Sequence, residues 1–571
     1  MLEAARRAAL DADLGVLGSR AGDWAGLAVA EKRALLGALH ASVGKVAAEW
    51  ARVACAAKGI PARSPLAGEE WISGPLGHLL YTTALGETLD QLAAGRSPLA
   101  GQRVGSAPGG RLRVRVRLPF EAYDQLLLNG FRAEVWLEPG ISLEQASARA
   151  GLRTRNPDGG GVGLVLGAGN ISSIAPLDAL YKLYADGRVV MLKLNPVNDY
   201  LYDVLEQAYA PFIGPGFVRI VRGGADVGAY LTEHPGVDEV HVTGSQATHD
   251  AIVFGAGREA ARRKATASPR LNKPITSELG GVAPVIVVPG DWTEADLRFQ
   301  AEHVATQRLH NGGFNCNASQ VVILADGWRQ KDDFVGHLRE AIRAAPGRPA
   351  YYPGADERQD RARAAHPGAE ALDGGSRRTL IVLDGGADDE AFVTEYFAAV
   401  LAVTELPGGA EDPAGFLARA AAFANDRLYG TLTANLIASP ATLRALGPRL
   451  DELIAELQYG TIGVNCWSGV GFLTPRASWG AFPGHPLTDI ESGAGVVHNA
   501  LLLAGTERTV VRGPFRPAPR SLVRGELTLS PKPPWFVGNR TADVTARRLT
   551  AFAARPRLRA LPGIFASALR G

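Results

Sequence analysis

The residue best suited to covalent chemistry is Cys316, in the segment HNGGFNCNASQVVILA. Residues 294–310 before it have the apolar spacing of a helix, and the run VVILA after it is typical of a strand. Cys316 is therefore expected on a glycine-containing turn, where its thiol can face a cleft and its backbone N–H can point at a substrate oxygen. A thiolate attacks carbonyl carbons when its surroundings lower the pKa of the thiol. The pattern by itself equally allows an inert cysteine.

Two further segments carry groups that could assist such a nucleophile. Glu278 stands in SELGG (277–281), directly before two glycines and an apolar run. It could act as a general base at a domain seam, or simply begin a turn. Asn170 stands in LGAGNIS (166–172), where its amide N–H could stabilise an oxyanion. Neither segment is decisive alone.

The turns between strands and helices supply candidates for nucleotide binding. The GxG of LGAGNIS lacks the third glycine of the dinucleotide fingerprint, because Ser172 stands in its place. Lys193, near the end of the next strand, could meet a nucleotide ribose. Gly244 and Ser245 follow a third strand and could meet a phosphate at a helix N-terminus.

The elements that must position these residues follow an α/β pattern. Residues 1–100 are predicted to be helical, and from about residue 160 β-branched runs alternate with helical stretches. The runs are 162–169, 188–195, 218–224 and 238–245, then 284–289, 321–325, 379–384, 431–439 and 460–466. Such alternation predicts parallel sheets in two domains with a boundary near residue 277.

Composition narrows the class of protein further. A chain of 571 residues is too long for one core, and a net charge of +2 without a long basic stretch argues against a nucleic-acid surface. Three cysteines, Cys55, Cys316 and Cys466, cannot build a disulfide framework and indicate a cytoplasmic location. No signal peptide and no membrane span are expected. His241 and His310 lack a second ligand at metal spacing, so no metal is predicted.

The ordered set GAGN, LKLNP, HVTGS, ELGG and NGGFNC resembles the aldehyde dehydrogenase superfamily over about residues 20–500. Members carry Asn in a post-strand loop, Lys about 23 residues later, a TGS turn, ELGG, and Cys in a GQxC-like loop; Asn170 and Lys193 have that spacing. Downstream, TEYFAAVLAV (394–403) is similar to the family's E-x-F-G-P-V segment. GTIGVNCW (460–467) is similar to its later Gly-x-Val-Asn strand.

The resemblance implies an architecture. It implies a Rossmann-like cofactor domain with N-terminal helices (1–277), a second α/β catalytic domain (278–470), and a return to the cofactor and oligomerisation region (471–504). Residues 505–571 lie beyond the resemblance, and their runs GPFRPAPR and SPKPPWF indicate a Pro-rich C-terminal extension. We expect this extension on the surface or across a subunit contact. The family is commonly dimeric or tetrameric, so a homodimer or homotetramer is expected. Residues 112–139 are a candidate oligomerisation arm.

The resemblance also implies a reaction: NAD- or NADP-dependent oxidation of an aldehyde to a carboxylic acid through a thiohemiacetal and a thioester on Cys316. It implies that Asn170 and the Cys316 N–H hold the oxyanion and that Glu278 activates the hydrolytic water. The cofactor residues it implies are Lys193, Gly244, Ser245, Glu395 at the nicotinamide ribose, and Phe397 against the nicotinamide.

Departures from the family pattern keep alternatives open. Gly313-Phe314 stand where Gly-Gln is usual, Ala398-Ala399 replace Gly-Pro, and residues 257–273 form a basic insertion. Pro196 stands where many NAD-preferring members have Glu, so NADP should be tolerated. The alternatives are a CoA-acylating aldehyde dehydrogenase or acyl-CoA reductase, and a non-catalytic binding or structural relative. Retention of Cys316 and Glu278 favours the hydrolytic enzyme.

Four residues near the expected substrate mouth have two interpretations. Trp467, Phe472 and Trp479 could line an apolar substrate tunnel, or be ordinary core aromatics. Cys466 is expected to be a lining residue rather than a second nucleophile.

Overall fold

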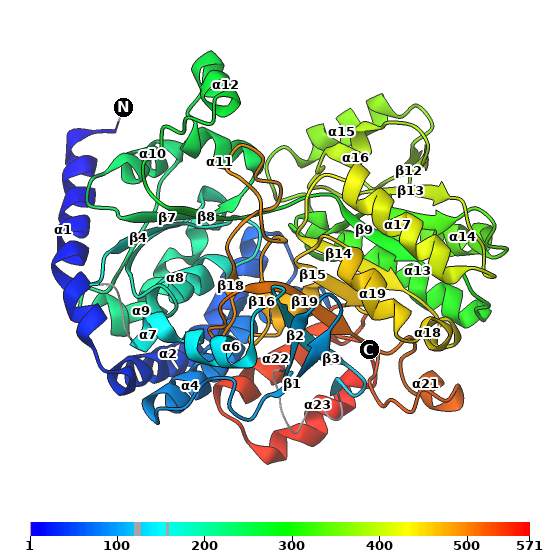
Figure 1. Ribbon diagram of the computed structural model, residues 1–571, viewed down its shortest axis with the longest axis horizontal. Coiled ribbons are helices and arrows are strands. Elements are labelled where there is room, and N and C mark those ends of the chain that lie inside the picture. Colours follow the sequence, from blue (N-terminus) through cyan, green and yellow to red (C-terminus); the bar gives the residue numbers. More distant parts are fainter. Residues whose placement is uncertain (1, 119–126, 156–158) are drawn as a thin grey trace.

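The computed structural model describes residues 2–118, 127–155 and 159–571, and it is an α/β fold built on two large sheets (Figure 1). The smaller sheet has the order β17-β8-β7-β4-β5-β6. Its parallel strands are β4 (Val162–Leu166), β5 (Val189–Lys193), β6 (Val218–Val221), β7 (Glu239–Gly244) and β8 (Ile275–Leu279), and β17 (Gly493–Ala494) is antiparallel. In chain order the parallel strands therefore lie third, second, first, fourth and fifth, which is the Rossmann arrangement. Ligands bind such sheets where this order reverses, here between β4 and β7.

Helices cover both faces of this sheet, and β5 is accordingly buried at every position. The helices between its strands are α8 (Ile174–Tyr184), the 3-10 helix η2 (Pro196–Leu201), α9 (Tyr202–Ile213), α10 (Ala225–Glu233), α11 (Gln246–Val253) and α12 (Gly257–Ala265). The N-terminal helices are α1 (Ala4–Gly26), α2 (Val29–Ala57), α3 (Ala67–Trp71), the π-helix η1 (Ile72–Leu76) and α4 (Gly77–Ala93). Helix α1 packs along the sheet and α2 packs on α4 and α9 (Figure 1).

The larger sheet has eleven strands in the order β1-β2-β3-β19-β15-β14-β9-β10-β13-β12-β11. Its parallel strands are β9 (Ala283–Val287), β10 (Ser319–Ala325), β12 (Thr379–Asp384), β13 (Val400–Leu406), β14 (Thr433–Ile437), β15 (Thr461–Val464) and β19 (Thr506–Arg512). At its two ends lie the antiparallel strands β1 (Arg103–Ala107), β2 (Arg111–Val116), β3 (Arg132–Leu137) and β11 (Glu370–Ala371).

The remaining elements connect or cover these sheets. Around the larger sheet lie α13 (Glu294–Leu309), the 3-10 turn η3 (His310–Gly313), α14 (Lys331–Ala344), α15 (Ala355–Ala365), α16 (Glu390–Val393), α17 (Pro413–Arg427), α18 (Pro440–Leu446), α19 (Arg449–Glu456) and α20 (Gly469–Leu473). The others are α6 (Leu143–Arg149), α7 (Leu152–Arg155), the strand pair β16 (Ser478–Trp479) and β18 (Val497–His498), α21 (Arg520–Val523), α22 (Ala542–Ala554), the 3-10 helix η4 (Leu558–Ala560) and α23 (Leu561–Ala568).

The passage between the two sheets lies slightly later than the sequence indicated. Strand β8 runs through residue 277 and ends at Leu279, so Glu278 belongs to the smaller sheet. The larger sheet begins with β9 at Ala283. The chain therefore crosses at Gly280–Val282. The domain limits at 470 and 504 stay predictions.

The expectation that residues 505–571 form an extension on the surface or across a subunit contact is wrong for their first part. Strand β19 pairs with β15 and β3 inside the larger sheet and is buried at all but its last residue. Val510 and Val511, both fully buried, explain this, since they face opposite sides of a sheet covered on both faces. Phe515, in the Pro-rich stretch, also packs on Trp292 with ring centroids 5.1 Å apart.

The candidate arm at residues 112–139 forms β2 and β3, and residues 119–126 within it lie outside the described part of the chain. Strand β3 pairs with β19 of the same chain, so the arm extends the larger sheet (Figure 1). Its part in a subunit contact stays a prediction.

Candidate active site

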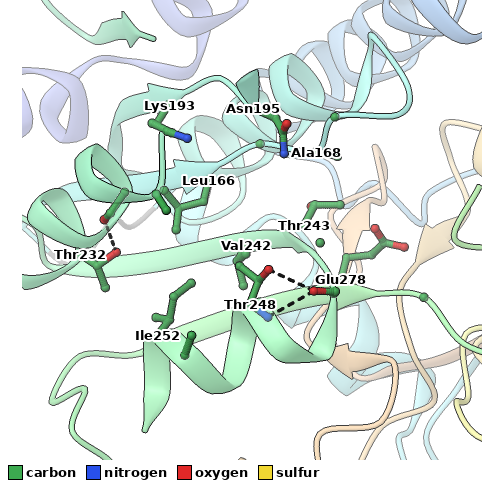
Figure 2. A pocket seen from close by; sticks show the side chains of 18 of the residues that line it. Leu166, Ala168, Lys193, Asn195, Thr232, Val242, Thr243, Thr248, Ile252 and Glu278 are labelled. Atoms are coloured by element: carbon green, nitrogen blue, oxygen red, sulfur yellow. Dashed lines mark hydrogen bonds between the residues drawn. The ribbon is translucent and has the colours of Figure 1, made fainter. Parts of the chain in front are cut away.

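A cavity of about 810 Å³ lies at the carboxyl ends of the strands of the smaller sheet and reaches the loops of the larger one. All eight residues singled out in the sequence line it: Asn170, Lys193, Gly244, Ser245, Glu278, Cys316, Glu395 and Phe397. In Figure 2, Glu278 lies at the end of the cavity away from Thr232, and Lys193 and Asn195 face α11 across it. The topology thus unites residues that are far apart in sequence.

Cys316 lies just beyond a strained left-handed turn. Asn311, Gly312 and Gly313 of η3 have φ values of 53°, 70° and 83°. A Cβ on Gly313 would lie 2.9 Å from the carbonyl of Ala398, so this turn requires glycine where it meets the Ala398-Ala399 backbone. Gly313, which precedes the departure at Phe314, therefore lies against Ala398, the first residue of the second departure.

The Cys316 thiol lies beside the carboxyl of Glu278, the fourth residue of β8, and both line the cavity. The indole N–H of Trp479 donates to Oε1 of Glu278 at 3.1 Å. Burial raises the pKa of Glu278 to about 7, and the bond from Trp479 opposes that rise. Burial, followed by the charge of Glu278, raises the pKa of Cys316 well above its usual value. The thiol therefore keeps its proton until a base takes it, and Glu278 is the base in contact.

Asn170 lies on the loop after β4 and is 5% exposed. Its Nδ2 donates to the carbonyl of Phe314 at 2.9 Å, two residues before Cys316. The amide of Asn170 and the backbone of the cysteine loop are therefore held side by side.

Glu395 and Phe397 close the cavity from the larger sheet. The Glu395 carboxylate accepts from the backbone N–H of Gly281 and lies so close to Gly280 that a Cβ there would be 2.0 Å from Oε1. Burial raises the pKa of Glu395 to about 8, while Arg308 and Arg358 oppose the rise. Phe397 packs edge-on against Tyr352, with ring centroids 4.9 Å apart.

The opposite end of the cavity has the features that a dinucleotide needs. Ser245 caps α11 by accepting from the N–H of Thr248 at 3.2 Å, and both residues line the cavity, so the helix N-terminus faces it. Lys193 and Arg270 also place cations along the cavity wall, whereas Arg358 lies at the other end, where it bonds to the carbonyl of Phe397. The volume lies within the ordinary range for ligand sites. The residues present therefore fit NAD or NADP.

Sequence reasoning missed several lining residues. Tyr352 and Arg358 come from the segment before and within α15, and Arg270 comes from the end of the basic insertion. Helix α12 of that insertion has no buried residue, and the chain then returns to the cavity at Arg270–Asn272. None of these residues lies in a sequence motif that indicates a binding site. The run YYPG at 351–354 indicates only a turn.

The four residues expected at the substrate mouth divide into two pairs. Trp479 and Phe472 pack with Cys316 in one apolar cluster. Cys466 and Trp467 belong instead to another core cluster, with Phe131 and Val511. They therefore do not line the cavity at Cys316. Burial raises the pKa of Cys466 to about 12, which makes its thiol a poor nucleophile.

With this geometry, comparisons with known proteins become informative. A model of the aldehyde dehydrogenase family matches residues 161–477, more than half of the chain. The chain belongs to the aldehyde dehydrogenase family. Similar curated proteins include a chloroplastic aminoaldehyde dehydrogenase of Arabidopsis thaliana, 27% identical over 316 residues (49% of this chain and 56% of that protein). Another is a peroxisomal aminoaldehyde dehydrogenase of Pisum sativum, 28% identical over 302 residues (47% and 53%). The chain thus spans about half the length of the curated relatives it matches.

Solved structures share the fold over a greater length. The gamma-glutamyl-gamma-aminobutyraldehyde dehydrogenase of Burkholderia cenocepacia has a TM-score of 0.58 at 19% identity, over 88% of this chain and 87% of its own. An aldehyde dehydrogenase of Pseudomonas syringae, solved with NAD+ and octanal, has a TM-score of 0.58 at 17% identity, over 90% of each chain. At such identities the match shows the aldehyde dehydrogenase fold.

Two other expectations from the sequence were that the chain has no membrane span and no metal site. No helix within residues 2–118, 127–155 and 159–571 is long and apolar enough to cross a membrane. In the same ranges no group of three or more His, Cys, Asp or Glu side chains is placed to hold a metal ion. His310 packs on Trp467, and His241 bonds to the hydroxyls of Thr276 and Thr243.

Proposed function

We propose that this protein oxidises an aldehyde to a carboxylic acid with NAD or NADP, through a covalent intermediate on Cys316. The observation that carries the proposal is the placement of the Cys316 thiol beside the Glu278 carboxyl, at one end of a cavity whose other end fits a dinucleotide. Family membership supports the same reaction.

Each group has a defined task in this reaction. Glu278 takes the thiol proton, and the Cys316 thiolate attacks the aldehyde carbon to form a thiohemiacetal. The amide of Asn170 and the backbone N–H of Cys316 hold the oxyanion. Each such donor stabilises the transition state by about 3–4 kcal/mol. Bound NAD or NADP supplies the hydride acceptor. Glu278 then takes a proton from the water that hydrolyses the thioester and frees Cys316.

The cofactor residues divide between the two ends of the cavity. Glu395 would orient the nicotinamide ribose of a bound cofactor, and Phe397 would pack on its nicotinamide ring. Gly244 and Ser245 offer the N-terminus of α11 to a phosphate, and Lys193 meets the adenosine ribose.

We propose that both NAD and NADP are accepted. The side chain of Asn195, a neutral amide, lines the cavity near Lys193, and Pro196 begins η2. No acidic side chain of that segment opposes a 2′-phosphate, since Asp199 does not line the cavity. Arg270 lines the same cavity from the end of α11, where it is paired with Glu233.

The test is absorbance at 340 nm with NAD or NADP and aldehydes of increasing chain length. We expect reduced cofactor with the wild type and none with Cys316→Ala. Cys466→Ala is the matched control, because that cysteine is buried in another cluster, away from the cavity. No product with any aldehyde, but oxidation of NADH or NADPH with an acyl-CoA, would assign the acylating reductase instead. Inactivity in both directions would assign a non-catalytic relative.

We further propose a homodimer or homotetramer in the cytoplasm. The three free thiols of Cys55, Cys316 and Cys466 support a reducing compartment. Light scattering of the purified protein checks the assembly.

A further inference from the structure

A buried charged cluster joins the N-terminal helices to the two loops that flank the Cys316 site. Lys58 follows α2 and is 1% exposed. Its ammonium donates to Oε1 of Glu70 at 2.8 Å, to the carbonyl of Asn170 at 3.0 Å and to Oδ1 of Asn311 at 3.1 Å. These three bonds use its whole donor capacity. Burial lowers the pKa of Lys58, but Glu70, Tyr351 and Tyr200 together outweigh burial and raise it, so the lysine is charged.

The carbonyl of Asn170 is the point on which this cluster converges. Besides Lys58, it accepts from Nδ2 of Asn311 at 3.2 Å and from the hydroxyl of Tyr351 at 3.0 Å. The ring of Tyr351 also lies 4.9 Å from the Lys58 ammonium, in cation–π geometry. Three donors on one backbone carbonyl fix the peptide that carries the Asn170 side chain.

Asn311 connects the same cluster to the loop at residues 314–316, which carries Cys316. Its Nδ2 lies within 3.1 Å of the carbonyl of Phe314 and of Oδ1 of Asn315, the residue before Cys316. Its backbone N–H donates to Oε2 of Glu69 at 3.0 Å, and Glu69 is paired with Arg348. Two acids and two bases balance the charge of the cluster.

We infer that Lys58 is a positioning residue for oxyanion stabilisation. The inference rests on the proposed function, in which the two oxyanion donors are the amide of Asn170 and the N–H of Cys316. These donors stand on separate loops, one after β4 and one after η3. Lys58 bonds to both loops and so sets the spacing of the donors. A displacement of about 1 Å in such a site costs on the order of 100-fold in rate.

The variant that tests this is Lys58→Met with Glu70→Gln, because removing Lys58 alone would leave a buried carboxylate without its partner. The milder variant Tyr351→Phe removes one donor to Asn170 and carries the test if the double variant does not fold. The matched control is Lys32→Met. Lys32 is also a 1%-exposed lysine of α2, but its ammonium bonds to the carbonyl of Ala25, away from the cavity.

Three measurements separate positioning from folding: kcat for aldehyde oxidation, KM for the cofactor, and the rate at which iodoacetamide alkylates Cys316. Alkylation forms a carbon–sulfur bond with loss of iodide and builds no oxyanion, so it reports on the thiol alone. We expect kcat of the double variant to fall about 10- to 100-fold, while KM and the alkylation rate stay within about twofold. Tyr351→Phe should show a smaller fall in kcat, and Lys32→Met none.

The outcomes are distinguishable. An unchanged kcat in both Lys58→Met/Glu70→Gln and Tyr351→Phe overturns the inference and leaves the proposed function intact. So does an alkylation rate that falls in parallel with kcat, since the cluster would then act on the nucleophile and not on the oxyanion. A wild-type protein inactive with every aldehyde removes the proposed function, and this inference with it.

Discussion

The pH dependence of turnover tests the Glu278–Cys316 pair most directly. Because burial raises the pKa of Glu278 to about 7, its carboxylate loses its proton within the neutral range. The group acts as a base, so activity is present above this pKa and is lost as the pH falls through it. About one-tenth of the carboxylate is ionised at pH 6 and about nine-tenths at pH 8, so the rate should rise about tenfold between them.

Two substitutions give this rise a structural assignment. Glu278→Gln should lower the plateau of kcat by about 100- to 10,000-fold and abolish the rise near pH 7. Trp479→Phe removes the indole N–H that stabilises the Glu278 carboxylate, so the pKa of Glu278 should increase and the rise should move to higher pH. Trp467→Phe is the matched control, because that buried indole packs on His310 in another cluster and should leave the profile unchanged.

The assay is steady-state formation of reduced cofactor from pH 5.5 to pH 9, with saturating aldehyde and cofactor. The reasoning is refuted if Glu278→Gln keeps the wild-type rise near pH 7, or if Trp479→Phe moves it to lower pH. Either result would mean that another group titrates in the active enzyme.

Two further predictions concern the cofactor. Gly280→Ala should raise KM for NAD and NADP and lower kcat/KM by at least about tenfold, because the new Cβ would lie 2.0 Å from Oε1 of Glu395. Gly18→Ala is the control, because the space around Gly18 is open. Equal kinetics in both variants would contradict the proposed place of Glu395. Arg270→Ala should raise KM for NADP about 10- to 100-fold more than KM for NAD, since a charge-assisted hydrogen bond to a phosphate contributes about 1.5–3 kcal/mol. Arg262→Ala, on the exposed helix α12, should change neither, and an equal effect of Arg270→Ala on both cofactors would place Arg270 away from the 2′-phosphate.

The sequence revealed those parts of the fold and the site whose signal is local. A strand such as β5 is a short apolar run ended by a turn, and periodicity finds it. The segment around Cys316 and SELGG are contiguous sequence motifs, and their order along the chain was enough to suggest the family. Strand β19 was missed because its neighbours in sequence are Pro-rich, whereas its burial depends on pairing with β15 and β3.

The residues that sequence reasoning missed act through contacts with residues distant in sequence, and no motif around them indicates those contacts. Lys58 meets Asn170 and Asn311 across 112 and 253 positions of the chain. Read in sequence, it is one more polar residue at the end of a helix, and only its three buried bonds distinguish it from a solvated lysine. Arg270 likewise looks like part of a basic insertion until the fold returns it to the cavity wall.

This contrast has a physical origin in how the site is assembled. Side chains that contact the substrate must be of a particular chemical type, and a short sequence motif can specify that type. Groups that fix the distance between two loops need only a charge or an amide at the right point in space, and different elements can supply it. In this chain the segment before residue 100 supplies it, because Lys58 and Glu69 bond to partners on or beside the catalytic loops and Glu70 pairs with Lys58. The N-terminal helices are therefore part of the active-site framework as well as a cover for the smaller sheet.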